Sequence, residues 1–225
     1  MKNIIHFLLL FITQQMSAQC WQSVSSGYDH SLAVKNDGTL WAWGYNSGGC
    51  LGFNESLENK RPQQIGTEND WLKVSSNFNS YYAIKTNGTL WAWGSNAYGQ
   101  LGIGTSISAL FPTQVGTDAN WLSISCTQDF CIALKTDGTL WAWGTNGIYG
   151  ISGSGILGDS STSNKSLPTE IKRITNLIDI ATSGTHVIAL TKEGKVYAWG
   201  KNDQGQLGIG SKDNKNFPVQ VGIDT

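Results

Sequence analysis

Two histidines are the side chains best suited to acid–base chemistry, and they occupy matching places in the chain. His30 and His186 each open an apolar stretch, HSLAVK and HVIALT. A histidine can serve as a general base because its ordinary pKa lies near 6.5. A catalytic histidine, however, needs a partner that occurs once, whereas this one recurs with its surroundings. The repetition favours a structural histidine that ties neighbouring loops together.

Acidic side chains could serve in acid–base catalysis, and a glycine-rich stretch could bind a dinucleotide. The surrounding residues support neither function. Asp37, Asp137 and Glu193 each precede a glycine, so we interpret them as turn formers rather than as a general acid and base. Residues 153–158 match GxGxxG, but DSSTSNKSLP follows where a dinucleotide site requires a helix. We therefore expect no catalytic residue and no cofactor.

The cysteines favour a disulfide over a metal site. No Cys-x-x-Cys pair is present, so the spacing does not predict zinc or another metal ion. Cys126 and Cys131 flank the four residues TQDF, which predicts a disulfide across one hairpin. Such a bond persists in an oxidising compartment. The alternative is that Cys50 and Cys126 only replace polar residues found at the same places in the other copies of the repeat.

The first 18 residues resemble a secretory signal peptide. Met1-Lys2-Asn3 precedes the apolar run IIHFLLLFI, and the small pair Ser17-Ala18 follows. A run of nine residues is shorter than the roughly 20 that a membrane-spanning helix needs. We expect cleavage after Ala18 or Gln19, and a protein that is secreted or held at the cell surface. Lipidation of Cys20 is the alternative.

Composition indicates an all-β protein without a nucleic-acid partner. The formal net charge is −1, which provides no basic surface for nucleic acid. Only 14% of residues are charged, while 27 are glycine and 10 are tryptophan. Glycines that punctuate aromatic and β-branched runs are typical of short strands joined by turns.

One phrase recurs along the chain and sets its organisation. GTLWAWG stands at 38–44, 88–94 and 138–144, and GKVYAWG stands at 194–200. The first three copies are 50 residues apart, and the fourth comes 56 residues after the third. A fixed period of this size is typical of propellers and solenoids.

Each unit reads as four strands. In the first unit we expect them at 21–24, 30–35, 39–44 and 62–66. The Asp37-Gly38 pair predicts a type I′ turn between the second and third strands. Four antiparallel strands per unit predict β-propeller blades, and Trp41, Trp43 and their copies are expected to pack one blade on the next. Residues 19–225 then form one repeat domain, with blades at about 21–66, 71–116, 121–171 and 178–222.

This unit resembles the repeat of the regulator of chromosome condensation family. The clearest instances are NGTLWAWGSNAYGQLGIG at 87–104 and EGKVYAWGKNDQGQLGIG at 193–210, and the resemblance covers about residues 21–222. It implies a seven-bladed propeller, here of an exported bacterial type. Members differ in activity: guanine-nucleotide exchange on a GTPase, ultraviolet sensing and β-lactamase inhibition. Ser80 and Phe130 depart from the family pattern, which has histidine there.

The chain carries four repeats where the resemblance implies seven. We therefore expect a partial propeller, an open arc in which the first and fourth blades do not pack together. Its uncovered ends would exceed the apolar patch that a monomer tolerates, so they predict self-association. The alternatives are a closed ring of four blades and blades completed by a second chain.

Function is expected in the parts that are not repeated. The loops after the first and third strands of each blade vary, and they leave a four-stranded antiparallel blade on the same face. Candidate binding residues on these loops are Tyr28, Asp29, Tyr45, Phe78, Tyr98, Ile148 and Tyr149. Tyrosine suits recognition because it brings rigid contact area at low entropic cost. The alternative is that some of these aromatic side chains fill gaps between blades.

These observations favour an exported, non-enzymatic scaffold that binds a protein or glycan. It would bind no nucleic acid and would not span a membrane. Guanine-nucleotide exchange, implied by the family resemblance, is the alternative, and a signal peptide argues against it because the GTPase would be cytosolic. A carbohydrate-active enzyme would require unique inward-facing carboxylates, and the sequence identifies none.

Overall fold

The computed structural model describes residues 20–46, 51–53, 58–148, 151–152 and 155–222. Over these residues it forms four antiparallel sheets of four strands each and one small hairpin, which confirms the all-β fold of propeller blades. We number the sheets blade 1 to blade 4 in chain order. Blade 1 holds β1 (Trp21–Ser26), β2 (His30–Lys35), β3 (Leu40–Tyr45) and β4 (Glu58–Ile65), and blade 2 holds β5 (Trp71–Ser76), β6 (Ser80–Lys85), β7 (Leu90–Gly94) and β8 (Ala109–Gln114).

The remaining strands make up the second half of the molecule. Blade 3 holds β9 (Trp121–Cys126), β10 (Phe130–Lys135), β11 (Leu140–Gly144) and β14 (Lys165–Glu170), and blade 4 holds β15 (Leu177–Thr182), β16 (His186–Thr191), β17 (Val196–Gly200) and β18 (Lys215–Gln220). The hairpin β12 (Gly147–Ile148) and β13 (Ile151–Ser152) lies between β11 and β14.

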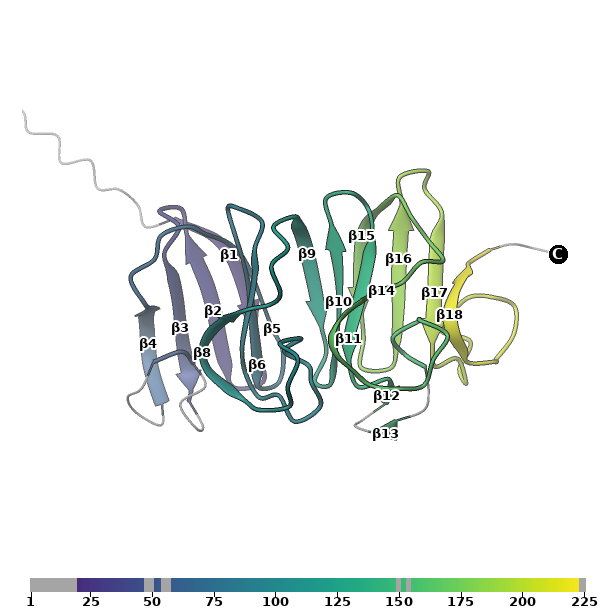
Figure 1. Ribbon diagram of the computed structural model, residues 1–225, viewed down its shortest axis with the longest axis horizontal. Coiled ribbons are helices and arrows are strands. Elements are labelled where there is room, and N and C mark those ends of the chain that lie inside the picture. Colours follow the sequence, from purple (N-terminus) through teal and green to yellow (C-terminus); the bar gives the residue numbers. More distant parts are fainter. Residues whose placement is uncertain (1–19, 47–50, 54–57, 149–150, 153–154, 223–225) are drawn as a thin grey trace, which may run out of the picture.

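The four blades stand side by side in a row (Figure 1). Blade 1 lies at one end of the longest axis and blade 4 at the other, so the described chain is not a closed four-bladed ring. Each boundary between neighbouring blades is filled by its own apolar cluster, to which both blades contribute. The blades therefore depend on their neighbours for a core, as in other repeat proteins.

Burial within a blade follows strand position. The second strands β6 and β10 are buried along their whole length, because neighbouring blades cover both of their faces. The fourth strands are the exposed edge and contain proline, which cannot donate to a further strand. The tryptophans of WAWG divide accordingly. Trp93, Trp143 and Trp199 are fully buried, whereas Trp41, Trp91 and Trp141 are only half-buried.

The turn between the second and third strands differs from the prediction. A type I′ turn requires positive φ at both central residues, but in blade 1 only Gly38 has it, at +80°. Gly38 N donates to the carbonyl of Lys35, and Lys35 N donates to the carbonyl of Thr39, which describes a three-residue loop with a glycine bulge. The Asp37 carboxylate accepts from the Thr39 N–H and hydroxyl and so fixes the loop from its polar side. Blade 3 repeats this pattern with Asp137 and Thr139.

A buried asparagine closes the long loop after each WAWG. The side-chain oxygen of Asn96 accepts from Leu101 N at 2.9 Å, and its amide donates to the carbonyls of Thr105 and Ile107. The corresponding asparagines of the other blades make the equivalent bond over the pairs Asn46–Leu51, Asn146–Leu157 and Asn202–Leu207. In blade 3 the bond spans 11 residues instead of five, because the hairpin β12–β13 is inserted inside the loop.

Candidate functional site

The variable loops leave the blades at one edge. Because each sheet is antiparallel and in sequence order, the loop after the first strand and the loop after the third strand emerge on the same side. This is the lower edge in Figure 1, where β12 and β13 lie. The shared edge agrees with the sequence analysis. The predicted residues lie at several separate places along this edge.

An aromatic pair lies on this edge where blades 1 and 2 meet. The ring of Tyr28, from the β1–β2 loop, lies 4.4 Å from the ring of Phe78, from the β5–β6 loop. Tyr28 remains 70% exposed, so the pair packs on itself and still faces solvent. Asn77 holds the β5–β6 loop that carries Phe78, since its oxygen accepts from Ser80 N and its amide donates to the carbonyl of Thr127 in the next blade. The pair is thus an exposed apolar surface on a fixed base.

Asp29 and Tyr45 form a second place in blade 1. Tyr45 N donates to the carbonyl of Asp29 at 2.8 Å, which joins the β1–β2 loop to the end of β3. Tyr45 is exposed. A shallow hollow here is lined by Asp29, Trp43, Gly44, Tyr45, Glu58, Asn59 and Lys60. Lys60 pairs with Glu58 at 3.0 Å, so charges of both signs stand beside aromatic surface.

Tyr98 lies elsewhere, in a polar hollow at the boundary of blades 2 and 3. Its backbone N–H donates to the side chain of Gln100, and the hollow is lined by Ala97, Tyr98, Gly99, Gly104, Thr105, Ser106, Asn164 and Ser166. Ile148 belongs to β12, where its backbone pairs with that of Ile151. Tyr149 lies outside the described residues.

His30 is buried and packs on the next blade. Its ring lies 4.5 Å from the ring of Tyr81, and its Nε2 fills the place where Gly27 lacks a side chain. Burial lowers the pKa of His30 from 6.5 to about 4, and the carboxylate of Asp29 offsets only part of this effect. The imidazole is therefore neutral at ordinary pH. His186 has a different environment, with Nδ1 at 2.8 Å from the hydroxyl of Ser183.

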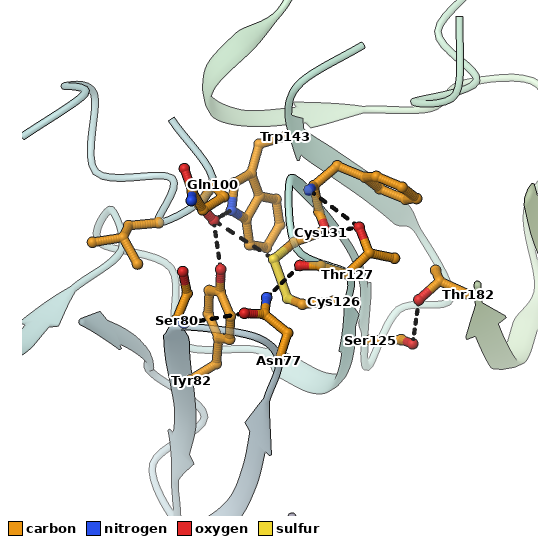
Figure 2. Close-up of a disulfide and its surroundings, with 12 residues drawn as sticks. Asn77, Ser80, Tyr82, Gln100, Ser125, Cys126, Thr127, Cys131, Trp143 and Thr182 are labelled. Carbon is orange, nitrogen blue, oxygen red and sulfur yellow. Dashed lines mark hydrogen bonds between the residues drawn. A yellow bond between two sulfur atoms is a disulfide. The ribbon is translucent and has the colours of Figure 1, made fainter. Parts of the chain in front are cut away.

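Cys126 and Cys131 form a disulfide between β9 and β10, the pairing that the sequence predicts (Figure 2). The two residues lie directly opposite each other in the strand register. The sulfur of Cys131 lies near the carbonyl of Gln100, and this carbonyl accepts hydrogen bonds from the Tyr82 hydroxyl at 2.9 Å and from Trp143 Nε1 at 2.8 Å. The disulfide thus belongs to the boundary between blades 2 and 3. Cys20 is exposed and free, and Cys50 lies outside the described residues.

The structure also shows a lysine clamp that the sequence analysis missed. In each of blades 1 to 3, a lysine at the end of the second strand lies over two tryptophan rings. The ammonium-to-ring distances are 5.3 and 3.5 Å for Lys35, 4.6 and 4.7 Å for Lys85, and 4.6 and 3.7 Å for Lys135. Blade 4 has Leu177, Thr191 and Tyr197 at the matching positions.

Each clamp fills what would otherwise be an aromatic cage for a cation. Lys85 pairs with Glu68 at 3.0 Å and with Asp70 at 3.1 Å, and Lys135 pairs with Asp118 at 2.8 Å. These carboxylates come from the linkers between blades. Cation–π and ionic contacts therefore fasten the linkers before blades 2 and 3 to the sheets that follow them. The recurrence of lysine and tryptophan at fixed places in the repeat was the available signal.

Within the described ranges, no group of three or more His, Cys, Asp or Glu side chains is arranged to hold a metal ion. No helix in that part of the chain has the length and apolar character needed to cross a bilayer. The predicted signal peptide, residues 1–18, lies outside the described residues.

Comparisons with known proteins agree with this architecture. The sequence pattern of the RCC1-like domain matches residues 7–224. The ultraviolet-B receptor UVR8 of Arabidopsis thaliana is 37% identical over 75 residues, which are 32% of this chain and 17% of the receptor. The serine/threonine-protein kinase Nek8 of Danio rerio is 30% identical over 77 residues, which are 33% of this chain and 11% of the kinase.

Two solved structures share the fold. Human WBSCR16 superposes with a TM-score of 0.75 at 25% identity, over 89% of this chain and 52% of that chain. Yeast RCC1 (Prp20), solved with Kap60, superposes with a TM-score of 0.77 at 21% identity, over 91% of this chain and 49% of that chain. The chain spans about half the length of these structures, and a smaller part of the curated relatives.

Proposed function

Because this chain belongs to the RCC1-like domain family, we propose that it is an exported, non-enzymatic scaffold that holds a protein or glycan partner on its loop edge. The observation that carries the proposal is the pair Tyr28 and Phe78, whose tilted rings lie against each other and remain exposed. Aromatic side chains on a rigid base contribute contact area with little loss of freedom on binding. The mixed charges beside Tyr45 add polar contacts on the same edge.

A non-enzymatic role is supported by the state of the groups that could do acid–base chemistry. His30 is buried and has a pKa of about 4, so it is a weak base and lies away from solvent. The hydroxyl and N–H of Thr39 lower the pKa of Asp37, and those of Thr139 lower the pKa of Asp137. Both carboxylates are therefore committed to their turns as acceptors.

The binding proposal is tested by removing the aromatic pair. The double variant Tyr28→Ser/Phe78→Ser should keep its fold, because both side chains are exposed, and should lose binding by about tenfold or more. The probes are a printed glycan array and the protein fraction secreted by the same cells. Phe111→Ser is the control, since Phe111 is an exposed aromatic residue on the edge strand β8.

Binding to the same glycan or secreted protein should survive in the control and be lost in the double variant. Equal binding by the parent, the double variant and the control would place the site elsewhere and would contradict the proposal.

Export is tested separately by cell fractionation and mass spectrometry. We expect the protein outside the cytosol, with a new N-terminus at residue 19 or 20. Guanine-nucleotide exchange on a GTPase, the alternative implied by the family, requires the protein to remain in the cytosol. Cytosolic protein that begins at Met1 would therefore favour the alternative.

A further inference from the structure

The hollow beside Tyr98 lies at the boundary of blades 2 and 3, and we call it the Tyr98 hollow. The loop between β7 and β8 supplies one wall, and Asn164 and Ser166, beside the start of β14, supply the other. Its volume is about 410 Å³, within the roughly 300–1,000 Å³ that is typical of small-molecule sites. The hollow therefore has room for a small ligand.

The walls of the Tyr98 hollow are fixed by contacts between the two blades. Gly104 N donates to the carbonyl of Ser166 at 2.8 Å, which joins one wall to the other. Gly99 approaches Ser166 so closely that a Cβ atom on Gly99 would lie 3.0 Å from Ser166 Cα. The buried side chain of Gln100 accepts from Tyr98 N at 2.9 Å and holds the loop from inside. A ligand thus meets walls that need little further ordering.

The lining is uncharged and rich in hydroxyl groups. Thr105, Ser106 and Ser166 are exposed, so their hydroxyls are open to a ligand. Tyr98 adds an aromatic ring and is 40% exposed. None of the described residues that line the hollow is Lys, Arg, Asp, Glu or His. Tyrosine together with serine, glycine and asparagine is the composition of protein surfaces specialised for recognition.

A neutral sugar matches this lining better than a charged ligand or a protein segment does. One face of a pyranose ring presents C–H groups, which pack on the negative face of an aromatic ring. Its rim presents hydroxyls, which exchange hydrogen bonds with hydroxyl and amide groups. A charged ligand would lose water here without gaining a counter-charge. A protein partner would require an apolar pocket within a larger contact surface, whereas this hollow offers one aromatic side chain.

Ser166 leaves open a space that the longer side chains at the matching positions would take. In each blade, the residue before this position pairs with the glycine of the third strand, so the four positions correspond. Serine is the smallest of the four residues found there. The counterparts of Ser166 are Lys60, Leu110 and Asn216.

Tyr98 supplies a ring that the loop does not require for its own closure. Its counterpart in blade 4 is Gln204, whose N–H donates to the side chain of Gln206 at 2.9 Å. Tyr98 N makes the same bond to Gln100 at the same distance. The base of the loop is therefore closed without an aromatic residue, which leaves the Tyr98 ring for another role.

We propose that the Tyr98 hollow binds a neutral sugar residue of a glycan. The apolar face of the sugar lies on the Tyr98 ring, and its hydroxyls bond to Thr105, Ser106 and Ser166. The inference rests on the proposed function in taking a glycan as the partner. It adds a site at a different blade boundary from the pair Tyr28 and Phe78.

The experiment is an NMR titration of the ¹⁵N-labelled chain with small probes. The neutral probes are the methyl glycosides of glucose, galactose, mannose and N-acetylglucosamine. Glucuronic acid and sialic acid are the charged probes, and an end-blocked Gly-Ser-Gly peptide represents a protein segment. We expect at least one neutral glycoside to shift the amide signals of Tyr98, Gly99 and Ser106. The two acids should bind about tenfold more weakly than that glycoside.

Two variants that copy other blades test the site. Tyr98→Gln copies Gln204 and removes the ring, and Ser166→Leu copies Leu110 and fills the hollow. Each should weaken binding of the glycoside by about tenfold or more. Phe111→Ser is the matched control, because Phe111 is an exposed aromatic residue on the edge strand of blade 2, and it should bind as the parent does. Thermal unfolding checks the fold, and Ser166→Asn replaces Ser166→Leu if that variant unfolds.

The outcomes separate this site from the pair Tyr28 and Phe78. Binding that is lost in Tyr98→Gln but kept in Tyr28→Ser/Phe78→Ser would support the Tyr98 hollow and count against the pair. The reverse result would leave the proposed function standing and overturn the inference.

Three other results would also overturn the inference. The first is that none of the four glycosides shifts the named amide signals. The second is that either acid binds more tightly than every neutral glycoside. The third is that the peptide shifts these signals and the sugars do not, which would show that the hollow takes a protein segment.

Discussion

At the residue scale, identical residues at matching positions of the repeat lie in different environments. His30 is packed against Tyr81 in the next blade, while His186 contacts Ser183 within its own loop. Trp43 and Trp143 share a place in WAWG, yet Trp143 is buried and donates to the Gln100 carbonyl of the preceding blade, whereas Trp43 is half-buried. What a repeated side chain does therefore depends on whether a neighbouring blade covers it.

His30 makes a prediction about pH. Its pKa is lowered by folding, so the unfolded chain binds a proton more readily between pH 6.5 and about 4. The free energy of unfolding should therefore fall as the pH is lowered through this window, by an amount on the order of 1–2 kcal/mol. Urea unfolding at pH 7 and pH 4 measures the loss.

The control for this effect is His30→Phe, which copies Phe130 at the matching place in blade 3. It should lose less stability between the two pH values, since the lowered pKa values of Asp37 and Asp137 affect both proteins equally. An identical loss in parent and variant would mean that His30 is not the group that titrates.

At the element scale, the long loop after WAWG is held by one buried amide. Asn96 satisfies the N–H of Leu101 and the carbonyls of Thr105 and Ile107 at the same time. The β12–β13 insertion in blade 3 leaves the equivalent bond from Leu157 to Asn146 intact. The loop can therefore vary in length and sequence, provided that its base is closed by the asparagine.

This arrangement predicts a large effect from a small substitution. Asn96→Ala leaves buried backbone groups without partners, and it should lower the free energy of unfolding by about 2–3 kcal/mol. Asn79→Ala is the control, because the side chain of Asn79 is exposed, and it should change stability by less than about 0.5 kcal/mol. Thermal and urea unfolding measure both. A loss below about 0.5 kcal/mol for Asn96→Ala would contradict the role given to the amide.

At the scale of the whole molecule, the blades and their order could be predicted from the sequence, because the WAWG phrase recurs at a nearly fixed spacing and marks each blade. The predicted type of the turn at Gly38 was wrong. An Asp-Gly pair suits both a type I′ turn and a three-residue loop with a glycine bulge, and the register of the two strands decides between them. The loop residues were placed on the correct edge, but their grouping was not predictable. Tyr28 meets Phe78 only because blades 1 and 2 are packed side by side.

The lysine clamps were missed for a related reason. A repeated Lys35 reads as a solvated charge at a strand end, and only the structure shows Trp21 and Trp41 beneath it. Contacts between residues that are distant in sequence depend on tertiary packing, which the local pattern does not encode.

The central claim is that each blade is stabilised by its neighbours. Hydrogen exchange of the dilute, unassociated protein, followed strand by strand, tests it most directly. The account predicts the slowest exchange in β6 and β10, which are buried along their whole length, and clearly faster exchange in β16, where Ile188 is 41% exposed. Exchange in β16 as slow as in β10 under these conditions would contradict the claim.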